Sequence, residues 1–198
     1  HEMTSVGYWT PIDEKDGKGK TLIYLLSFPS REAARESWKA FGQDPEWKKV
    51  QAESEKDGKI VERVESVFLD PAGYGPTPSP GGSAREPRAF ELRTYLASPG
   101  KLGDLHKRFQ DDTIDIFNTH GMTSVGYFEP IDESKGRGTT LVYMLAFPSR
   151  DAARTSWEAF RNDPVWKKAK AASEADGIPL AAKVTSVYLE PTDYSPMK

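Results

Sequence analysis

The chain has 198 residues, of which 37% are hydrophobic and 11% aromatic, a composition typical of a folded protein and not of a disordered segment. Its net charge is only -3 and its acidic and basic residues are interspersed, which argues against nucleic acid as a partner. The absence of cysteine excludes disulfides and thiolate metal sites, and no apolar run approaches the ~20 residues of a membrane span, so we expect a cytoplasmic protein.

Two stretches of the sequence are copies of each other. Residues 3–58 return as residues 122–177 with roughly two-thirds of the aligned positions identical, far above chance similarity within one sequence. The match continues toward the C-terminus with one extra residue in the second copy, whereas upstream it stops at His1, the counterpart of His120. We infer a duplication in which the first copy lacks the opening strand and helix of the second.

A connector separates the two copies. The segment GYGPTPSPGGSAREPR is rich in Pro, Gly and Ser, residues that leave little to bury and favour an extended chain. We therefore expect a partial domain over residues 1–74, a linker over residues 75–88 and a complete domain over residues 89–198.

The second copy begins with a predicted strand and a long predicted helix. In AFELRTYLA, Phe90 and Leu92 alternate with Arg93 and Tyr95, so the two faces of the strand differ in chemistry. Residues 101–119 then place apolar side chains at three- and four-residue steps, which indicates a helix with one apolar stripe.

The rest of the second copy completes a recognisable order of elements. MTSVGYFEP and TLVYMLAF, joined by a polar loop with glycines, predict a hairpin, and a helix follows with Ser149 as its N-cap. Asp163 and Pro164 begin a second, short helix, and AAKVTSVYLEP predicts the last strand. The order is β-α-β-β-α-β, so we expect an α+β fold built on a ferredoxin-like antiparallel sheet with helices on one face.

The uncovered face of such a sheet needs a partner. Exposed apolar surface costs about 25 cal/mol per Å², and units of this kind therefore pair face to face. The duplication supplies a partner within the chain, so we expect a fused pseudo-dimer whose two sheets meet inside a barrel. A homo-oligomer is a further candidate assembly.

The motifs of the second copy resemble those of the NIPSNAP family. In chain order they are FELRTY, PGKL, HGM ahead of VGYF, AARTSWEAF, DPVWKK and LEPTDYSP. The resemblance covers residues 89–198 and, as a partial second match, residues 1–76, and it implies a dimeric α/β-barrel fold. Eukaryotic members have mitochondrial and vesicle-associated roles, and the wider superfamily holds small monooxygenases, haem-degrading enzymes and isomerases, so the resemblance implies architecture more than chemistry.

His120 is the candidate for proton transfer. An imidazole at a helix end beside the barrel interior can have a pKa near neutrality. The alternative is a structural histidine that faces the negative end of the helix dipole, and we favour it because the dipole alone accounts for a histidine at this position. His1 is its counterpart in the first copy.

Arg93 and Tyr95 are candidates for holding an anion. They share one face of the first strand and could bind a carboxylate or an enolate inside the barrel, whereas the alternative is that Arg93 pairs with a surface glutamate. The first copy has no counterpart of either residue, so we expect at most one fully equipped pocket per chain.

Aromatic residues recur in both copies. Tyr127 and Tyr143, with their counterparts Tyr8 and Tyr24, are candidates for lining an aromatic cavity that takes a planar ligand, and ordinary packing on the sheet is the alternative. A second set at helical spacing is expected to be core: Trp157, Phe160 and Trp166, with the counterparts Trp38, Phe41 and Trp47.

The sequence favours neither a metal site nor a cofactor. His1, His106 and His120 lack metal-ligand spacing, and the glycines of the hairpin loops do not lie between a strand and a helix, where a phosphate cradle forms. Asp111 and Asp112 are adjacent on a helix and do not share a face, so they make no carboxylate dyad.

Two functions from different classes stay open. We favour a non-catalytic module that binds a small apolar or aromatic ligand or a protein partner, because no nucleophile or metal constellation is found. The alternative is a cofactor-independent, monooxygenase- or isomerase-like enzyme acting on a small aromatic or keto compound, with His120 as base and Arg93 and Tyr95 as anion holders.

The first copy carries a structural deficit. The first strand of a ferredoxin-like sheet lies between the third and the last strand, so the first copy as written has two strand edges without a partner. We expect either a segment upstream of His1 or a strand from another chain to fill this gap.

Overall fold

The computed structural model describes residues 1–81 and 88–198, so residues 82–87 of the predicted linker lie outside the described residues and the domain boundaries stay predictions. The first copy forms β1 (Thr4–Pro11), a 3-10 turn (Glu14–Asp16), β2 (Ile23–Ser27), α1 (Arg31–Gln43), α2 (Pro45–Ser54) and β3 (Leu69–Pro71). The second forms β4 (Ala89–Ala97), α3 (Leu102–Arg108), a π-helical turn (Phe109–Thr113), α4 (Ile114–Thr119), β5 (Thr123–Pro130), a 3-10 turn (Glu133–Lys135), β6 (Thr140–Phe147), α5 (Arg150–Asn162), α6 (Pro164–Ser173) and β7 (Ala181–Pro191).

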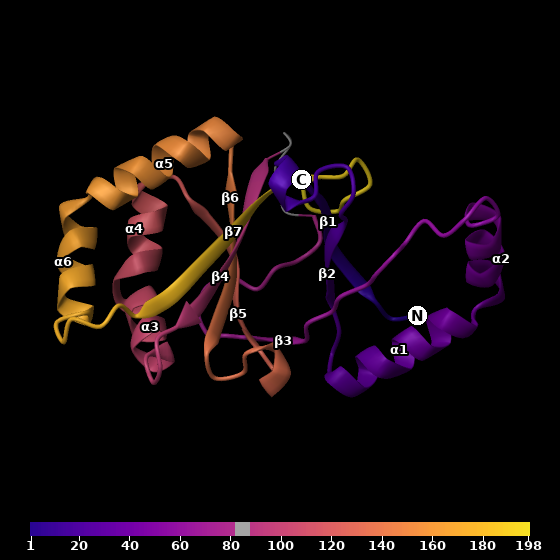
Figure 1. Cartoon of the computed structure of the whole chain (residues 1–198), viewed down its shortest axis with the longest axis horizontal. Coiled ribbons are helices and arrows are strands. Elements are labelled where there is room, and N and C mark those ends of the chain that lie inside the picture. The colour runs from indigo at the N-terminus through magenta and orange to yellow at the C-terminus, as the bar shows by residue number, and fades with distance from the viewer. Residues whose placement is uncertain (82–87) are drawn as a thin grey trace.

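All the described strands belong to one antiparallel sheet in the order β2-β1-β7-β4-β6-β5-β3. Its middle part, β7-β4-β6-β5, is the ferredoxin-like sheet predicted for the second copy, with the first strand β4 between β6 and β7. Helices α3 to α6 cover one face of this sheet, and α1 and α2 lie on the far side of the molecule (Figure 1). The predicted α+β fold class is confirmed.

The first copy extends the sheet of the second copy at both of its edges. At one edge β1 pairs with β7 so that Pro11 lies opposite Leu189, and at the other β3 pairs with β5 so that Leu69 lies opposite Pro130. These are the same contact seen twice, because Leu69 corresponds to Leu189 and Pro11 to Pro130 in the repeat. The two copies are therefore related by an internal two-fold arrangement, as in an isologous dimer.

Ion pairs between the copies follow the same two-fold relation. Arg31 of the first copy donates from both terminal nitrogens to Asp132 of the second, at 2.7 and 3.0 Å. Their counterparts with the roles of the copies exchanged, Arg150 and Asp13, lie 3.4 Å apart. The contact is thus self-complementary in its side chains as well as in its backbone.

The two faces of the sheet bury separate cores. The larger core lies under α3 to α6 and contains Phe117, Tyr143 and Trp157. The smaller core fills the barrel interior with apolar side chains from both copies, and there the fully buried Trp9 of β1 meets Phe90 of β4 with ring centroids 5.4 Å apart.

The long helix predicted over residues 101–119 is not a uniform α-helix. A π-helical turn, Phe109–Thr113, separates α3 from α4, and Thr113 Oγ1 donates to the backbone oxygen of Arg108 at 3.0 Å. Such turns insert a residue into the helix and frequently occur at functional sites. Among the described helices none is both long and apolar enough to cross a bilayer.

The core positions predicted for Trp38 and Trp47 of the first copy are wrong, because both side chains are exposed. The counterpart of β7 also pairs only over Leu69–Pro71. In the second copy the equivalents of these elements pack against β4 and α3 to α4, for which the first copy has no counterpart.

Replacing Trp9 by alanine tests the shared core. Because the indole is fully buried between the copies, the W9A substitution should lower the free energy of unfolding by about 3–5 kcal/mol, measured by urea denaturation. The matched control W38A, at an exposed tryptophan, should cost less than about 1 kcal/mol. Equal losses for both variants would contradict a core shared by the two copies.

Candidate functional site

Glu91, Arg93 and Tyr95 project from β4 toward the helices. Phe90, their neighbour in the strand, belongs to the core of the barrel interior, whereas Tyr95 packs on the core under the helices. The prediction that Arg93 and Tyr95 lie inside the barrel is therefore wrong. Apolar and polar side chains alternate along β4. Its apolar side chains face the apolar barrel interior, so its polar side chains face α5 and α6.

A basic cleft of about 550 Å³ opens between this face of β4 and helices α5 and α6. Its lining comprises Glu91, Arg93, Tyr95, Arg150, Arg154, Trp157, Phe160, Arg161, Trp166, Lys170, Ser186 and Tyr188. The four arginines and one lysine oppose a single carboxylate, although the chain as a whole has a net charge of -3. Positive charge is thus concentrated in a cleft with aromatic walls, which favours an anion.

Arg93 is the most buried cation of the basic cleft. Its Nη1 donates to Glu91 Oε1 at 2.5 Å and its Nη2 to Tyr95 OH at 3.1 Å, while the guanidinium lies 4.2 Å from the ring centroid of Trp157. Burial opposes its charge, but Tyr143, Tyr95 and Glu91 more than offset burial and raise the pKa of Arg93. Its Nε is buried without a hydrogen-bond partner in the described part of the chain, so one donor is left for another acceptor.

Glu91 is fully buried and is satisfied by the protein itself. Its Oε2 accepts a hydrogen bond from Trp157 Nε1 at 2.5 Å, and its Oε1 accepts from Arg93. Burial, followed by the charge of Glu91, raises the pKa of the neighbouring Tyr188 to about 12. Since Glu91 balances Arg93, the cations at the rim give the basic cleft its net positive charge.

The rim cations are exposed and weakly paired. Arg154 lies 3.6 Å from Asp151 and Lys170 lies 4.0 Å from Glu174, contacts that contribute little at an exposed surface. Arg161 has no carboxylate within salt-bridge distance in the described residues. These side chains are therefore free to turn toward an anionic ligand.

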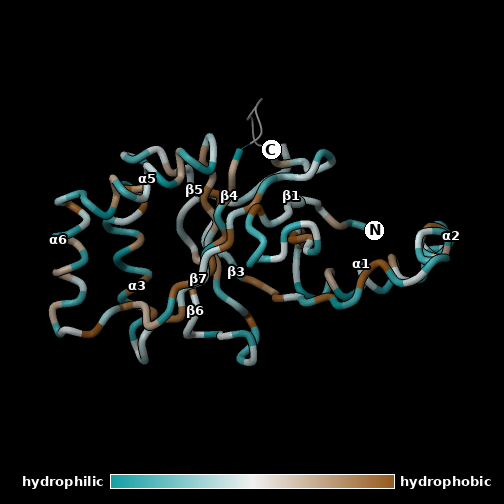
Figure 2. The backbone as a smooth tube through the Cα atoms, turned by 45° about the horizontal axis from the view of Figure 1, so that its top comes forward, coloured by the Kyte–Doolittle hydropathy of each residue, from teal (hydrophilic) through white to brown (hydrophobic). Residues whose placement is uncertain are grey.

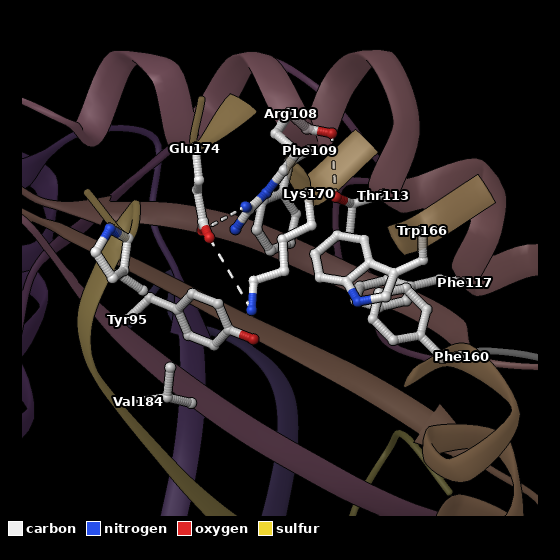
Figure 3. A pocket seen from close by; sticks show the side chains of 12 residues that line it. Tyr95, Arg108, Phe109, Thr113, Phe117, Phe160, Trp166, Lys170, Glu174 and Val184 are labelled. Carbon is white, nitrogen blue, oxygen red and sulfur yellow. Dashed lines mark hydrogen bonds and ion pairs between the residues drawn. The ribbon is translucent and has the colours of Figure 1, made fainter. Parts of the chain in front are cut away.

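A smaller and more enclosed cavity of about 200 Å³ adjoins the basic cleft (Figure 3). The two spaces share Tyr95, Phe160, Trp166 and Lys170. The other walls of the cavity come mainly from Phe109 and Thr113 of the π-helical turn, Phe117, Pro179, Ala181, Val184 and the pair Arg108–Glu174. Together the two spaces offer an aromatic chamber beside a basic entrance.

Arg108 and Glu174 hold the π-helical turn against α6. Arg108 Nη1 donates to Glu174 Oε1 at 2.9 Å, and its guanidinium lies 5.0 Å from the ring centroid of Trp166 (Figure 3). Sequence reasoning missed both residues, because they lie far apart in the chain and the π-helical turn that brings them together leaves no periodic signal.

His120 is not part of either cavity. Its Nε2 lies 2.7 Å from Oδ2 of Asp163, the residue that caps α6 through the backbone N–H groups of Val165 and Trp166. His120 first, and then these backbone donors, lower the pKa of the Asp163 carboxyl. His1 and Asp44 make the same contact at 2.6 Å in the first copy. The pair joins the end of one helix to the start of another, which supports the structural role of His120.

Tyr127 and Tyr143 are fully buried and line neither cavity. Their rings lie 5.6 Å apart in the core under the helices, and burial raises the pKa of Tyr127 to about 12. Their counterparts Tyr8 and Tyr24 lie 5.9 Å apart, and Tyr24 is exposed. Tyr143 nevertheless contacts both strand residues, since its ring centroid lies 5.3 Å from that of Tyr95 and 5.9 Å from the Arg93 guanidinium. The buried pair packs on the sheet, whereas Tyr8 and Tyr24 lie in the first copy.

His106 connects the two copies. Its Nδ1 lies 2.7 Å from the hydroxyl of Tyr74, which follows β3, and its Nε2 lies 3.2 Å from Glu129 of β5. Burial lowers the pKa of His106, and the charge of Glu129 only partly opposes this effect. Within the described ranges, no group of three or more His, Asp or Glu side chains is placed to hold a metal ion.

Comparison with known proteins identifies the family. The sequence profile described as NIPSNAP matches residues 1–76 and 90–196, which is most of the chain and includes both copies. The chain belongs to the NIPSNAP family. The resemblance inferred from the motifs is therefore confirmed, and the profile is matched twice, as expected for a tandem NIPSNAP protein.

Several solved structures are similar to this NIPSNAP chain. A NIPSNAP family protein from Agrobacterium tumefaciens is similar with a TM-score of 0.51 and 21% identity over 61% of this chain and 100% of that chain. A second one from the same organism, described as having unknown function, has a TM-score of 0.49, 24% identity and coverages of 58% and 97%. An anthrone oxidase-like protein covers 100% of this chain and 81% of its own at 12% identity, with a TM-score of 0.55. No curated protein matches the sequence.

The buried His106 should make stability depend on pH. Because its folded-state pKa lies below the ordinary 6.5, the unfolded chain binds the proton first as the pH falls. The contribution of the neutral His106 to the free energy of unfolding is complete above about pH 6.5 and is lost as the pH decreases further. Urea denaturation midpoints between pH 7 and 5 should fall less steeply in H106Q than in the unmodified chain. The exposed neighbour variant K107Q should keep the original slope, and an unchanged slope in H106Q would refute the assignment.

Proposed function

We propose that this NIPSNAP chain is a non-catalytic module that binds a small aromatic carboxylate, with the carboxylate in the basic cleft and the ring in the adjoining cavity. The observation that supports this proposal most is the environment of the Arg93 side chain. Its guanidinium is mostly buried, lies against Trp157 and Tyr95, and keeps an unpartnered Nε beside the exposed rim cations.

The chemistry of the two spaces matches the two ends of such a ligand. Guanidinium groups bind carboxylates through charge-assisted hydrogen bonds, and Arg161 and Arg154 can add further donors at the entrance. Aromatic walls favour a planar ring, and because a dry cavity of about 150 Å³ suffices for benzene, about 200 Å³ suits a compound of one or two rings.

A cofactor-independent enzyme in these spaces has less support. It requires a base next to the anion holders, but His120 pairs with Asp163 and lines neither space. Glu91, the carboxylate next to Arg93, is already bound by Arg93 and Trp157. The anthrone oxidase-like structure shares the fold at 12% identity, which does not extend to chemistry.

Binding of 1-naphthoate tests the proposal. We expect saturable binding by isothermal titration calorimetry at low salt, weaker binding as the salt concentration rises, and at least about tenfold weaker binding of the neutral analogue 1-naphthalenemethanol. The double variant R154A/R161A removes two rim cations and should weaken 1-naphthoate binding by about tenfold without changing the fold.

The matched control is R35A, since Arg35 is the counterpart of Arg154 in the first copy and lies on α1, away from the basic cleft. It should bind 1-naphthoate as the unmodified chain does. Equal binding of the acid and the alcohol, or equal losses in R35A and R154A/R161A, would refute an anion-binding cleft.

Substitution of His120 distinguishes the hypothesis of a binding module from that of an enzyme. If the His120–Asp163 pair only joins two helices, H120A should lower the melting temperature and leave the dissociation constant of 1-naphthoate within about twofold. The alternative, an enzyme, would be established by a different result. The unmodified chain would turn over an aromatic or keto compound, and H120A would abolish this turnover at a temperature where the variant is folded.

A further inference from the structure

The adjoining cavity and the basic cleft lie along β4 and β7 in successive levels, each made by one residue of β4 and the residue opposite it. In order, these pairs are Tyr95 with Val184, Arg93 with Ser186, and Glu91 with Tyr188. Tyr95 and Val184 line the cavity, so the cavity is at the first level. Since neighbouring levels are two residues apart in β4, they are separated by about 7 Å. The last level, at Tyr188, therefore lies about 13 Å from the cavity and beyond Arg93.

Arg150 provides the positive charge at the last level. It is the first residue of α5, lines the basic cleft, and has its guanidinium carbon 3.3 Å from the ring centroid of Tyr188. Hydrophilic positions recur along α5, where Arg154 and Arg161 follow (Figure 2). A carboxylate bound at Arg93 lies one level away from Arg150. A ligand with a single acidic group thus leaves this end of the basic cleft unused.

A carboxylate of the first copy already contacts Arg150. Asp13, in the loop between β1 and β2, has its Oδ2 3.4 Å from Nη2 of Arg150. This distance is long for an ion pair of these groups, and the side chains are partly exposed, at 43% for Arg150 and 33% for Asp13. Such a pair contributes little to stability, so an anion from solution can replace Asp13 at small cost.

The two-fold equivalent of this contact is tighter. Arg31 donates to both carboxylate oxygens of Asp132, at 2.7 and 3.0 Å, and its guanidinium lies 4.9 Å from the ring centroid of Phe68. Arg31 lines neither the basic cleft nor the adjoining cavity. The same residue types thus make a bidentate contact away from the basic cleft and a single, longer contact at its end. The weak pairing of Arg150 is therefore a feature of the basic cleft and not of contacts between the copies in general.

We propose that Arg150 forms a second anion subsite, and that the ligand is an aromatic compound with two acidic groups, one bound at Arg93 and the other at Arg150 in place of Asp13. This inference rests on the proposed function, because it extends the same ligand outward from the cavity. Asp13 is an internal competitor that holds Arg150 while the subsite is empty. The second acidic group displaces it and gains a charge-assisted hydrogen bond from the guanidinium, so the site selects dianions.

A matched pair of ligands tests the second anion subsite. N-(1-naphthoyl)glutamate carries a second carboxylate, and N-(1-naphthoyl)glutamine has a neutral amide of similar shape in its place. In isothermal titration calorimetry, the unmodified chain should bind the glutamate compound about tenfold more tightly than the glutamine compound. R150A should abolish this preference, so that the two dissociation constants agree within about twofold.

Substitution of Asp13 distinguishes competition from a purely structural contact. D13N removes the competing charge, so it should tighten binding of N-(1-naphthoyl)glutamate about threefold and leave binding of N-(1-naphthoyl)glutamine within about twofold. The matched control D132N weakens the two-fold equivalent contact with Arg31 and should not change the binding of either compound. If Asp13 only joined the two copies, D13N would weaken binding or leave it unchanged.

The outcomes separate this inference from the proposed function. Equal binding of the two compounds by the unmodified chain and by D13N, with 1-naphthoate still bound, would overturn the second anion subsite alone. A preference for the glutamate compound that D13N does not increase would overturn the role of Asp13 as a competitor. If 1-naphthoate and both compounds failed to bind to any of these chains, the subsite and the proposed function would both be wrong.

Discussion

The pairing of β1 with β7 and of β3 with β5 is the constraint on which the architecture depends. It brings Leu69 opposite Pro130 and Leu189 opposite Pro11, so that a single type of strand contact is used twice. These contacts position the first copy against the apolar face of β4, and they let Trp9 fill the barrel interior that the second copy alone leaves open. Because the barrel interior is filled by packing, the basic cleft and the adjoining cavity lie on the opposite face of the sheet.

Much of the fold follows from the sequence. The alternation in residues 89–97, the hairpin of β5 and β6, the Asp-Pro start of α6 and the repeat are local or periodic signals, and each is found in the structure. The pairing of the two copies also follows, since an uncovered sheet face needs a partner. The exposure of Trp38 was not predicted, because the repeat suggests for it the packing of its counterpart Trp157, which lies against Phe117.

The candidate site was harder to predict. Alternation correctly places Arg93 and Tyr95 on one face, but it does not say which face turns to the helices, and only the burial of Phe90 in the barrel interior decides this. The rim cations on α5 and α6 looked like an ordinary charged helix surface in the sequence. Their significance depends on β4 lying beneath them, which is a long-range property of the fold, and the π-helical turn that shapes the adjoining cavity has no sequence signal.

The internal duplication has a consequence for assembly and for divergence. In a dimer of identical chains every substitution appears on both sides of the two-fold axis, and the pairing weakens on dilution. Here the two halves are joined covalently, so their pairing does not depend on protein concentration. Each half is also free to change alone: where the second copy has Arg161 and Lys170 at the cleft, the first has Gly42 and Gln51. One half can thus specialise in recognition while the other acts as a built-in scaffold.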